Sequence, residues 1–62
     1  MCLATAYLKN EASTSVLAKN ISNIKIDGNS VVLTDILGAE LVVPGRLITA
    51  DLVNGVVEIL AA

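Results

Sequence analysis

Apolar residues recur at every second position along much of this chain, in short runs that end at Gly, Asn, Asp or Pro. Val, Ile, Leu and Thr dominate these runs. A period of two places alternate side chains on opposite faces of a strand, whereas an amphipathic helix needs a period near 3.6. The pattern therefore predicts β-strands, and no helix is expected.

The predicted strands are residues 2–8, 15–18, 21–27, 30–36, 40–43, 47–53 and 56–60, the second being only a short candidate, so about six strands are expected. Short strands at this spacing are typical of a small barrel or meander. In the third segment Ile24 and Ile26 are expected to face inward, with Lys25 outward.

Turn residues separate the predicted strands. Asn54-Gly55 between two β-branched runs is the strongest hairpin signal in the chain. Asp27-Gly28-Asn29 predicts another tight turn, because Gly and Asn tolerate a positive φ at low cost. Pro44-Gly45 is expected to end a strand, since proline cannot donate to a ladder.

The chain has 62 residues, so one domain is expected over residues 1–62. A domain this short is marginal alone and usually needs a disulfide, a metal or oligomerisation. The single Cys excludes an intrachain disulfide, and the absence of His excludes an ordinary Cys/His zinc cage. With 55% apolar residues and a mean hydropathy of +0.78, some apolar surface is expected to form an interface. A homo-oligomer is the expected state.

Charge argues against nucleic acid as a partner. The net charge is −2 and the four basic residues, Lys9, Lys19, Lys25 and Arg46, are scattered. Tyr7 is the only aromatic residue, too few for a stacking platform. No signal peptide is predicted, and no apolar run approaches the roughly 18 residues of a membrane span. The cytoplasm is the expected location and no membrane partner is expected.

Catalysis is not expected either. General acid–base chemistry near neutral pH usually falls to His, and the chain has none. The six carboxylates form no recognisable motif, and the four glycines are isolated, so no phosphate-binding loop is present. The chain is therefore interpreted as a protein without enzymatic activity.

Cys2 is the residue that could carry chemistry. A lone Cys is usually a small buried hydrophobe, and that interpretation stays open. At position 2, however, the thiolate lies beside its own amide nitrogen and the chain's α-amine. If Met1 is retained, amine, amide and sulfur can close two chelate rings. If Met1 is removed, the Cys2 amine and sulfur close one.

Planar nitrogen and sulfur ligands suit a metal that accepts square-planar coordination. Ni(II) and Cu(II) both do, whereas Zn(II) prefers a tetrahedron. One chain offers too few ligands to complete a site. Two chains related by a two-fold axis would supply two Cys2 thiolates and further nitrogens, so a homodimer would complete it.

The whole chain resembles the CooT family, small nickel-binding proteins associated with maturation of carbon monoxide dehydrogenase. The resemblance rests on the length, on the opening Met1-Cys2-Leu3-Ala4, on Val43-Pro44-Gly45, and on residues 50–57, Ala-Asp-Leu-Val-Asn-Gly-Val-Val. It implies a small SH3- or Sm-like β-barrel, a homodimer, and one Ni(II) bound at the dimer interface through Cys2, with Met1 beside it.

Three functions are compatible with these residues and with the resemblance. The leading hypothesis is a metallochaperone whose homodimer holds one Ni(II) through paired Cys2 and delivers it to carbon monoxide dehydrogenase or a similar nickel enzyme. The second is an Sm-like RNA-binding module, which the acidic composition disfavours. The third is a structural or regulatory dimer that binds no ligand.

Overall fold

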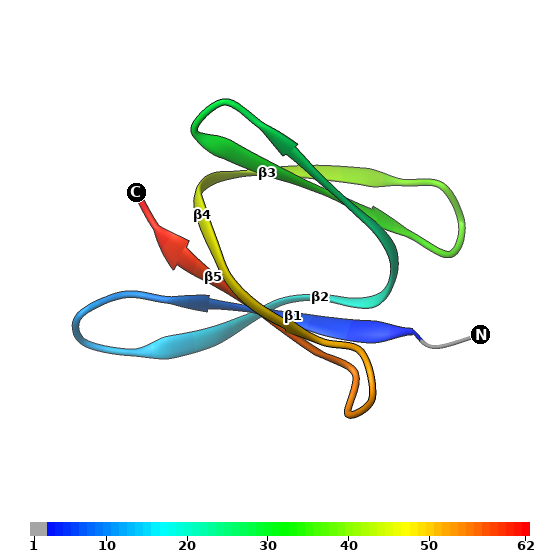
Figure 1. Ribbon diagram of the computed structural model, residues 1–62, viewed down its shortest axis with the longest axis horizontal. Helices are drawn as coiled ribbons and strands as arrows, with labels where there is room; N and C mark the ends of the chain where they lie inside the picture. Colours follow the sequence, from blue (N-terminus) through cyan, green and yellow to red (C-terminus); the bar gives the residue numbers. More distant parts are fainter. Residues whose placement is uncertain (1–2) are drawn as a thin grey trace.

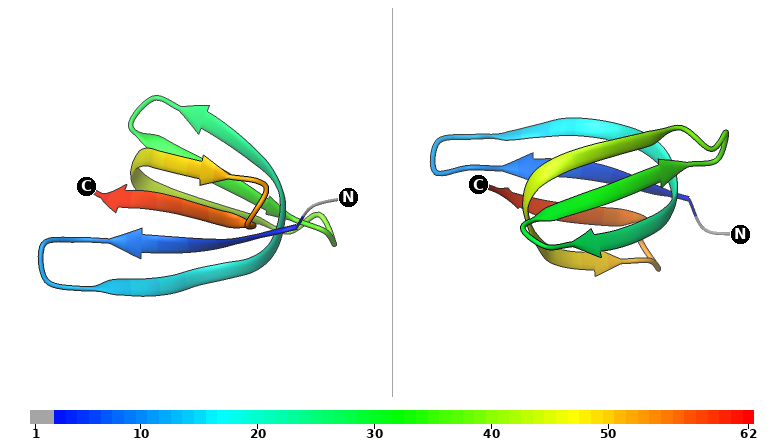
Figure 2. Two further views of the ribbon diagram at one scale, coloured as in Figure 1. Left: turned by 60° about the horizontal axis from the view of Figure 1, so that its bottom comes forward. Right: turned by 90° about the horizontal axis from the view of Figure 1, so that it is seen from above.

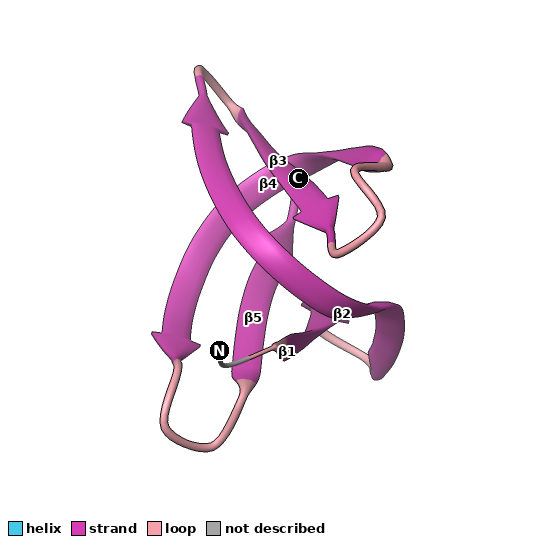
Figure 3. Ribbon diagram, turned by 90° about the vertical axis from the view of Figure 1, so that its right-hand side faces the viewer, coloured by secondary structure: helices cyan, strands magenta, loops and turns pink. Residues whose placement is uncertain are grey.

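Five β-strands form a closed barrel in the computed structural model, which describes residues 3–62 (Figure 1). The strands are β1 (Ala4–Lys9), β2 (Thr14–Asp27), β3 (Ser30–Asp35), β4 (Glu40–Asp51) and β5 (Val56–Ala61). Successive strands pair antiparallel, and a parallel pairing of β1 with β5 closes the ring. The all-β prediction is confirmed. The described residues contain no helix, and hence none that could cross a membrane (Figure 3).

The described part of the chain has five strands rather than about six, because two long strands continue through predicted breaks. β2 pairs with β1 through its first half and with β3 through its second half. Asn20 lies between the halves with φ at +59°, a left-handed conformation that Asn tolerates better than most residues. β2 therefore bends and changes partner without ending.

β4 likewise continues through Pro44-Gly45, where the sequence predicted a stop. Pro44 is the last partner of β3, and Gly45 is the first partner of β5. Because the ladder changes sides here, the missing proline N–H falls at the end of a pairing rather than inside one. Gly45 has φ at +146°, and a Cβ there would overlap the carbonyl oxygen of Leu60. Only glycine fits this bend.

The core is small and built from short side chains. Its buried residues come from all five strands: Ala4, Ala6, Ile21, Val31, Leu33, Val43, Val57 and Ile59. Ile24 packs against this cluster, as predicted. Ile26 was expected inside but is 58% exposed. It pairs with Val31 near the β2–β3 turn, at the rim of the barrel, where a hollow lined also by Arg46 leaves it open.

Three segments lie toward the same end of the barrel, at different places around it. They are the start of β1, the β3–β4 loop (residues 36–39) and the β4–β5 turn (residues 52–55), all on the right in both views of Figure 2. We call this the N-terminal end. The β1–β2 hairpin and the end of β5 lie at the opposite end (Figure 2).

Candidate metal centre

The predicted metal ligands Met1 and Cys2 lie outside the described residues, so their geometry stays a prediction. The structure does describe the segment that follows them, at the start of β1. Ala4 is buried, and the main-chain N–H of Thr5 donates a hydrogen bond of 2.8 Å to the carbonyl oxygen of Gly55. The chain is therefore held in the barrel from the second residue after Cys2 onward.

The β4–β5 turn that holds this segment is organised by Asp51. One carboxylate oxygen accepts the main-chain N–H groups of Val53, at 3.2 Å, and of Asn54, at 3.1 Å. The other accepts the Asn54 side-chain amide at 2.8 Å. These bonds, the side-chain amide foremost, favour the charged carboxylate and lower the pKa of Asp51 below its usual value of 3.8. Asp51 is thus occupied with the turn.

Gly55 completes the turn beneath the N-terminal segment. Its φ is +69°, and a Cβ at this position would come within 3.0 Å of the Leu3 carbonyl oxygen. The hairpin predicted around Asn54-Gly55 is confirmed, but its loop is longer than two residues, because Asp51 and Val56 are the last pair of the ladder. The turn demands glycine both for its conformation and for the close approach of Leu3.

The β3–β4 loop repeats the same construction. One carboxylate oxygen of Asp35 accepts the N–H groups of Leu37, at 2.8 Å, and of Ala39, at 3.0 Å. The Asp35 main chain also accepts from the Gly38 N–H at 3.0 Å. An Asp that accepts hydrogen bonds from the residues after it is a common way to begin a turn.

Each of these two turns presents a pair of apolar residues to solvent. Leu37 is 90% exposed and Val53 is 93% exposed, and their neighbours Ile36 and Leu52 are more than half exposed. We call these four residues the apolar tips. Sequence reasoning treated both segments only as turns or strand ends. The available signal was the recurrence of Asp followed by two large apolar residues, at 35–37 and at 51–53.

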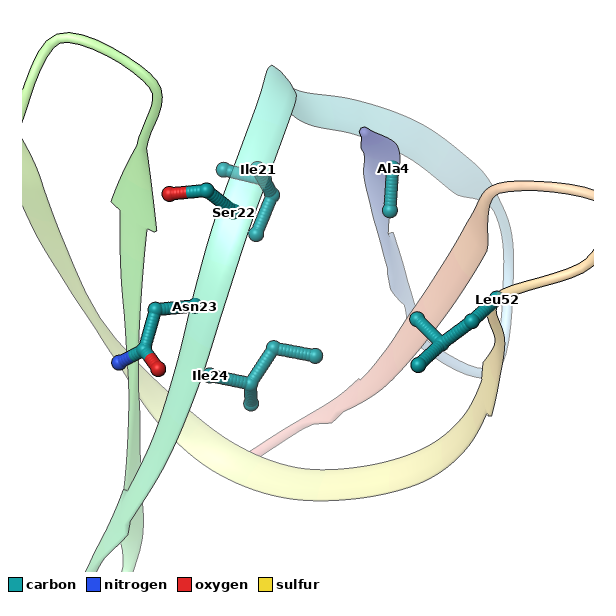
Figure 4. Close-up of a pocket in the computed structure, with 6 residues that line it drawn as sticks. All are labelled: Ala4, Ile21, Ser22, Asn23, Ile24 and Leu52. Atoms are coloured by element: carbon teal, nitrogen blue, oxygen red, sulfur yellow. The ribbon is translucent and has the colours of Figure 1, made fainter. Parts of the chain in front are cut away.

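A shallow hollow of about 280 Å³ lies beside the start of β1. It is lined by Ala4, Ile21, Ser22, Asn23, Ile24 and Leu52 (Figure 4). The Ser22 hydroxyl points away from it and donates to the carbonyl oxygens of Thr34 and Asp35, at 3.3 and 3.2 Å. The hollow therefore offers mainly aliphatic surface next to the N-terminal segment.

Ligands for a metal are not assembled elsewhere in the described chain. Within residues 3–62, no three side chains among Cys, Asp and Glu converge into a possible metal site. Lys9 and Glu58 form an ion pair of 3.0 Å on neighbouring strands β1 and β5. Cys2 and Met1 remain the residues on which the predicted nickel site rests.

The fold and the N-terminal frame define a small closed β-barrel whose one end gathers the start of β1 and the apolar tips. The family model for CooT, described as a CO dehydrogenase accessory protein, matches residues 1–60. The chain therefore belongs to the CooT family, and the resemblance noted from its sequence is confirmed.

A crystal structure from Carboxydothermus hydrogenoformans that is assigned to CooT has the same fold. It matches with a TM-score of 0.86 over 98% of each chain, at 16% sequence identity. Comparison with curated proteins gave no match.

Proposed function

We propose that this chain is a nickel-binding metallochaperone without enzymatic activity of its own. Two copies hold one Ni(II) between them through paired Cys2 thiolates and nearby N-terminal nitrogens, with Met1 adjacent. The receiving partner is carbon monoxide dehydrogenase or a similar nickel enzyme. Membership of a family of CO dehydrogenase accessory proteins supports the assignment of the partner.

One structural observation carries the proposal. The start of β1, two residues after Cys2, lies at the end of the barrel that presents the apolar tips. A second copy that covers Leu37 and Val53 would bring the two N-termini toward a common two-fold axis. Apolar surface that leaves water on association favours such a pairing.

The position of the ligands suits transfer rather than storage. A site at a chain terminus, on an end face, can be approached by the ligands of a receiving protein. The proposal places the protein in the cytoplasm, where the Cys2 thiol stays reduced. It also assigns the barrel to the SH3 or Sm type.

The two alternative functions have less support. An Sm-like RNA-binding module needs a basic face, and one of the few cations, Lys9, is paired with Glu58. A ligand-free dimer would leave the metal-capable sequence at position 2 without a use. A gel shift at low salt tests the first alternative, because binding driven by phosphate contacts is strongest there.

The test of the site is the substitution Cys2→Ser. We expect the variant to lose tight Ni(II) binding while its far-ultraviolet circular dichroism and unfolding midpoint stay unchanged, because the barrel core is built from other residues. Retention of one Ni(II) per two chains by Cys2→Ser protein would refute the assignment.

A further inference from the structure

The second half of β2 is paired with another strand on one side only. β3 pairs with it from Asn23 to Asp27, whereas β1 reaches no further along β2 than Ile21. Among residues 3–62, no strand pairs with the other side of residues 23–27, and no hydrogen bond from a loop or turn reaches it. We call this side the open edge. A strand with an open side is a template for pairing with a further strand.

The β2–β3 hairpin determines which main-chain groups face the open edge. Asp27 and Ser30 flank a two-residue loop, so their main-chain groups face each other. Because main-chain groups alternate in direction along a strand, those of Lys25 also face β3. Ile24 and Ile26 therefore each present one N–H and one C=O to the open edge. An extended polypeptide can satisfy such a row with its own main chain, whereas a small molecule cannot.

Two hollows follow the same stretch of β2. The first is the hollow beside the start of β1, where Ile24 and Leu52 point toward each other (Figure 4). The second, of about 350 Å³, is lined by Ile26, Gly28, Val31, Gly45, Arg46 and Leu47. Ile24 and Ile26 lie two residues apart on one face of β2, a spacing of about 7 Å. Alternate side chains of an added strand have the same spacing, so each can enter one hollow.

The two hollows differ in charge. No charged side chain lines the first. Arg46 is exposed at the second, whose lining contains no carboxylate. Arg46 forms no ion pair with any other residue among 3–62. A guanidinium beside aliphatic surface favours a carboxylate as its partner, because the two groups form charge-assisted hydrogen bonds.

We infer that the open edge binds an extended segment of another protein, in which an aliphatic and an acidic residue lie two positions apart. Residues opposite Ile24 and Ile26 direct their side chains to the same face as these isoleucines. The aliphatic residue lies opposite Ile24 and enters the first hollow. The acidic residue lies opposite Ile26, and its carboxylate pairs with Arg46. Main-chain hydrogen bonds supply the affinity, and the two side chains supply the specificity.

This surface goes beyond the proposed nickel site and is independent of it. It uses neither Cys2 nor Met1, so binding of the segment is expected in the metal-free protein. Failure of this binding would leave the nickel site standing. Loss of nickel binding in the Cys2→Ser variant would likewise leave the open edge intact.

A synthetic peptide, acetyl-Thr-Val-Thr-Glu-Thr-Val-Thr-amide, is the probe that tests the inference. Its valines and glutamate share one face of the extended peptide and lie two positions apart in either chain direction. The peptide is titrated, with EDTA and a reducing agent, into the full chain labelled with a nitrogen isotope for nuclear magnetic resonance. We expect saturable shifts of amide signals that are largest at Ile24 and Ile26. Absence of saturable binding, or shifts centred elsewhere, would overturn the inference.

Charge reversal tests the role of Arg46. We expect Arg46→Glu to raise the dissociation constant of the peptide at least about tenfold. Lys25→Glu is the matched control, because it changes the net charge equally but lies on the opposite face of β2 from Ile24 and Ile26. A peptide with lysine in place of glutamate should recover binding to the Arg46→Glu variant. Equal weakening by the two substitutions would overturn the pairing with Arg46.

Peptides methylated on main-chain nitrogens test the strand pairing. Methylation at the valines and the glutamate removes the donors that face β2, so we expect binding to be lost. Methylation at the threonines between them removes donors that face away and should have a much smaller effect. Equal loss with both peptides would overturn the inference. Hexanoate that binds as tightly as the peptide would also overturn it, because the second hollow would then take a small carboxylate.

Discussion

The main-chain N–H of Thr5 donates to the carbonyl oxygen of Gly55 at 2.8 Å, joining the beginning of the chain to the β4–β5 turn. This bond connects the segment that follows Cys2 to a turn that Asp51 organises and that Gly55 closes with a positive φ. The proposed nickel ligands thus extend from a point fixed by the barrel. Changes in the turn are expected to reach the metal site.

Gly55→Ala should destabilise the protein by about 1–3 kcal/mol, because alanine is strained at φ +69° and its Cβ would press on the Leu3 carbonyl oxygen. Gly28→Ala is the matched control, since φ there is +58° and nothing lies within 4 Å of an added Cβ. Urea unfolding measures both. A loss for Gly28→Ala as large as that for Gly55→Ala would contradict the close approach of Leu3.

Gly55→Ala should also weaken Ni(II) binding relative to Gly28→Ala, since the displaced Leu3 adjoins Cys2. Competition for Ni(II) with a coloured chelator measures this. Equal Ni(II) affinity in the two variants would mean that the turn does not position the ligands.

Asp51 should make stability dependent on acid. Its folded-state pKa lies below the usual value of 3.8, so its contribution is complete above that pH. The contribution is lost as pH falls from about 3.8 through the lower folded-state pKa. Asp51→Asn should therefore unfold at a lower temperature than the unmodified protein at neutral pH, and the gap should narrow below pH 3.8. Thermal unfolding followed by circular dichroism across this range measures the gap.

Asn54→Ala provides the control for the origin of this effect. The Asn54 side-chain amide is the largest cause of the lowered pKa of Asp51. Its removal should reduce the acid-dependent part of the stability. If the difference in unfolding temperature between the Asp51→Asn variant and the unmodified protein stays constant with pH, the charge of the carboxylate is not involved.

The apolar tips should control pairing at the N-terminal end. Leu37→Asp combined with Val53→Asp places carboxylates where the two copies are proposed to meet, without touching the core. We expect the pairing through nickel to weaken at least about tenfold, with the fold retained. Val42→Asp is the control, because it changes an exposed apolar residue that is not one of the tips.

Sedimentation velocity with and without one Ni(II) per two chains measures this pairing. The effect is expected only in the species that nickel links. Unchanged nickel-dependent association in the double variant would remove the apolar tips from the interface.

Local sequence signals predicted the strands and turns well where each strand has the same partners throughout. Asn54-Gly55 and Asp27-Gly28-Asn29 mark turns in the structure, because a positive φ at these glycines needs no tertiary context. The strand predicted at residues 30–36 corresponds to β3, in which Val31 and Leu33 are buried. Period and turn chemistry sufficed for these elements.

Strand ends were predicted wrongly at the two places where a strand bends and changes its pairing partner. Pro44 and Asn20 resemble strand ends locally, yet β4 and β2 continue past them because a second neighbour takes over the pairing. Ile26 has the inward period but lies at the rim, where more than half of it is exposed. The strand that is available for pairing depends on how the barrel closes. The local pattern of apolar residues does not specify this.

The candidate site likewise has one part that the sequence predicts and one that it does not. The metal-capable chemistry at Cys2 could be proposed from sequence, because the amine, amide and thiol are adjacent along the chain. The apolar tips could not, because the loop of Leu37 and the turn of Val53 are distant in sequence and come to the same end of the barrel only through the topology. The sequence alone also does not tell whether an apolar residue in a turn is buried or exposed.

The most direct test of the central claim is a titration of reduced protein with Ni(II), followed by ultraviolet–visible absorption and native mass spectrometry. We expect a thiolate-to-nickel charge-transfer band that saturates at one Ni(II) per two chains and is absent after Cys2→Ser. A folded protein that shows no band and binds no nickel would contradict the proposed function, and membership of the CooT family would then have to be explained by another accessory role.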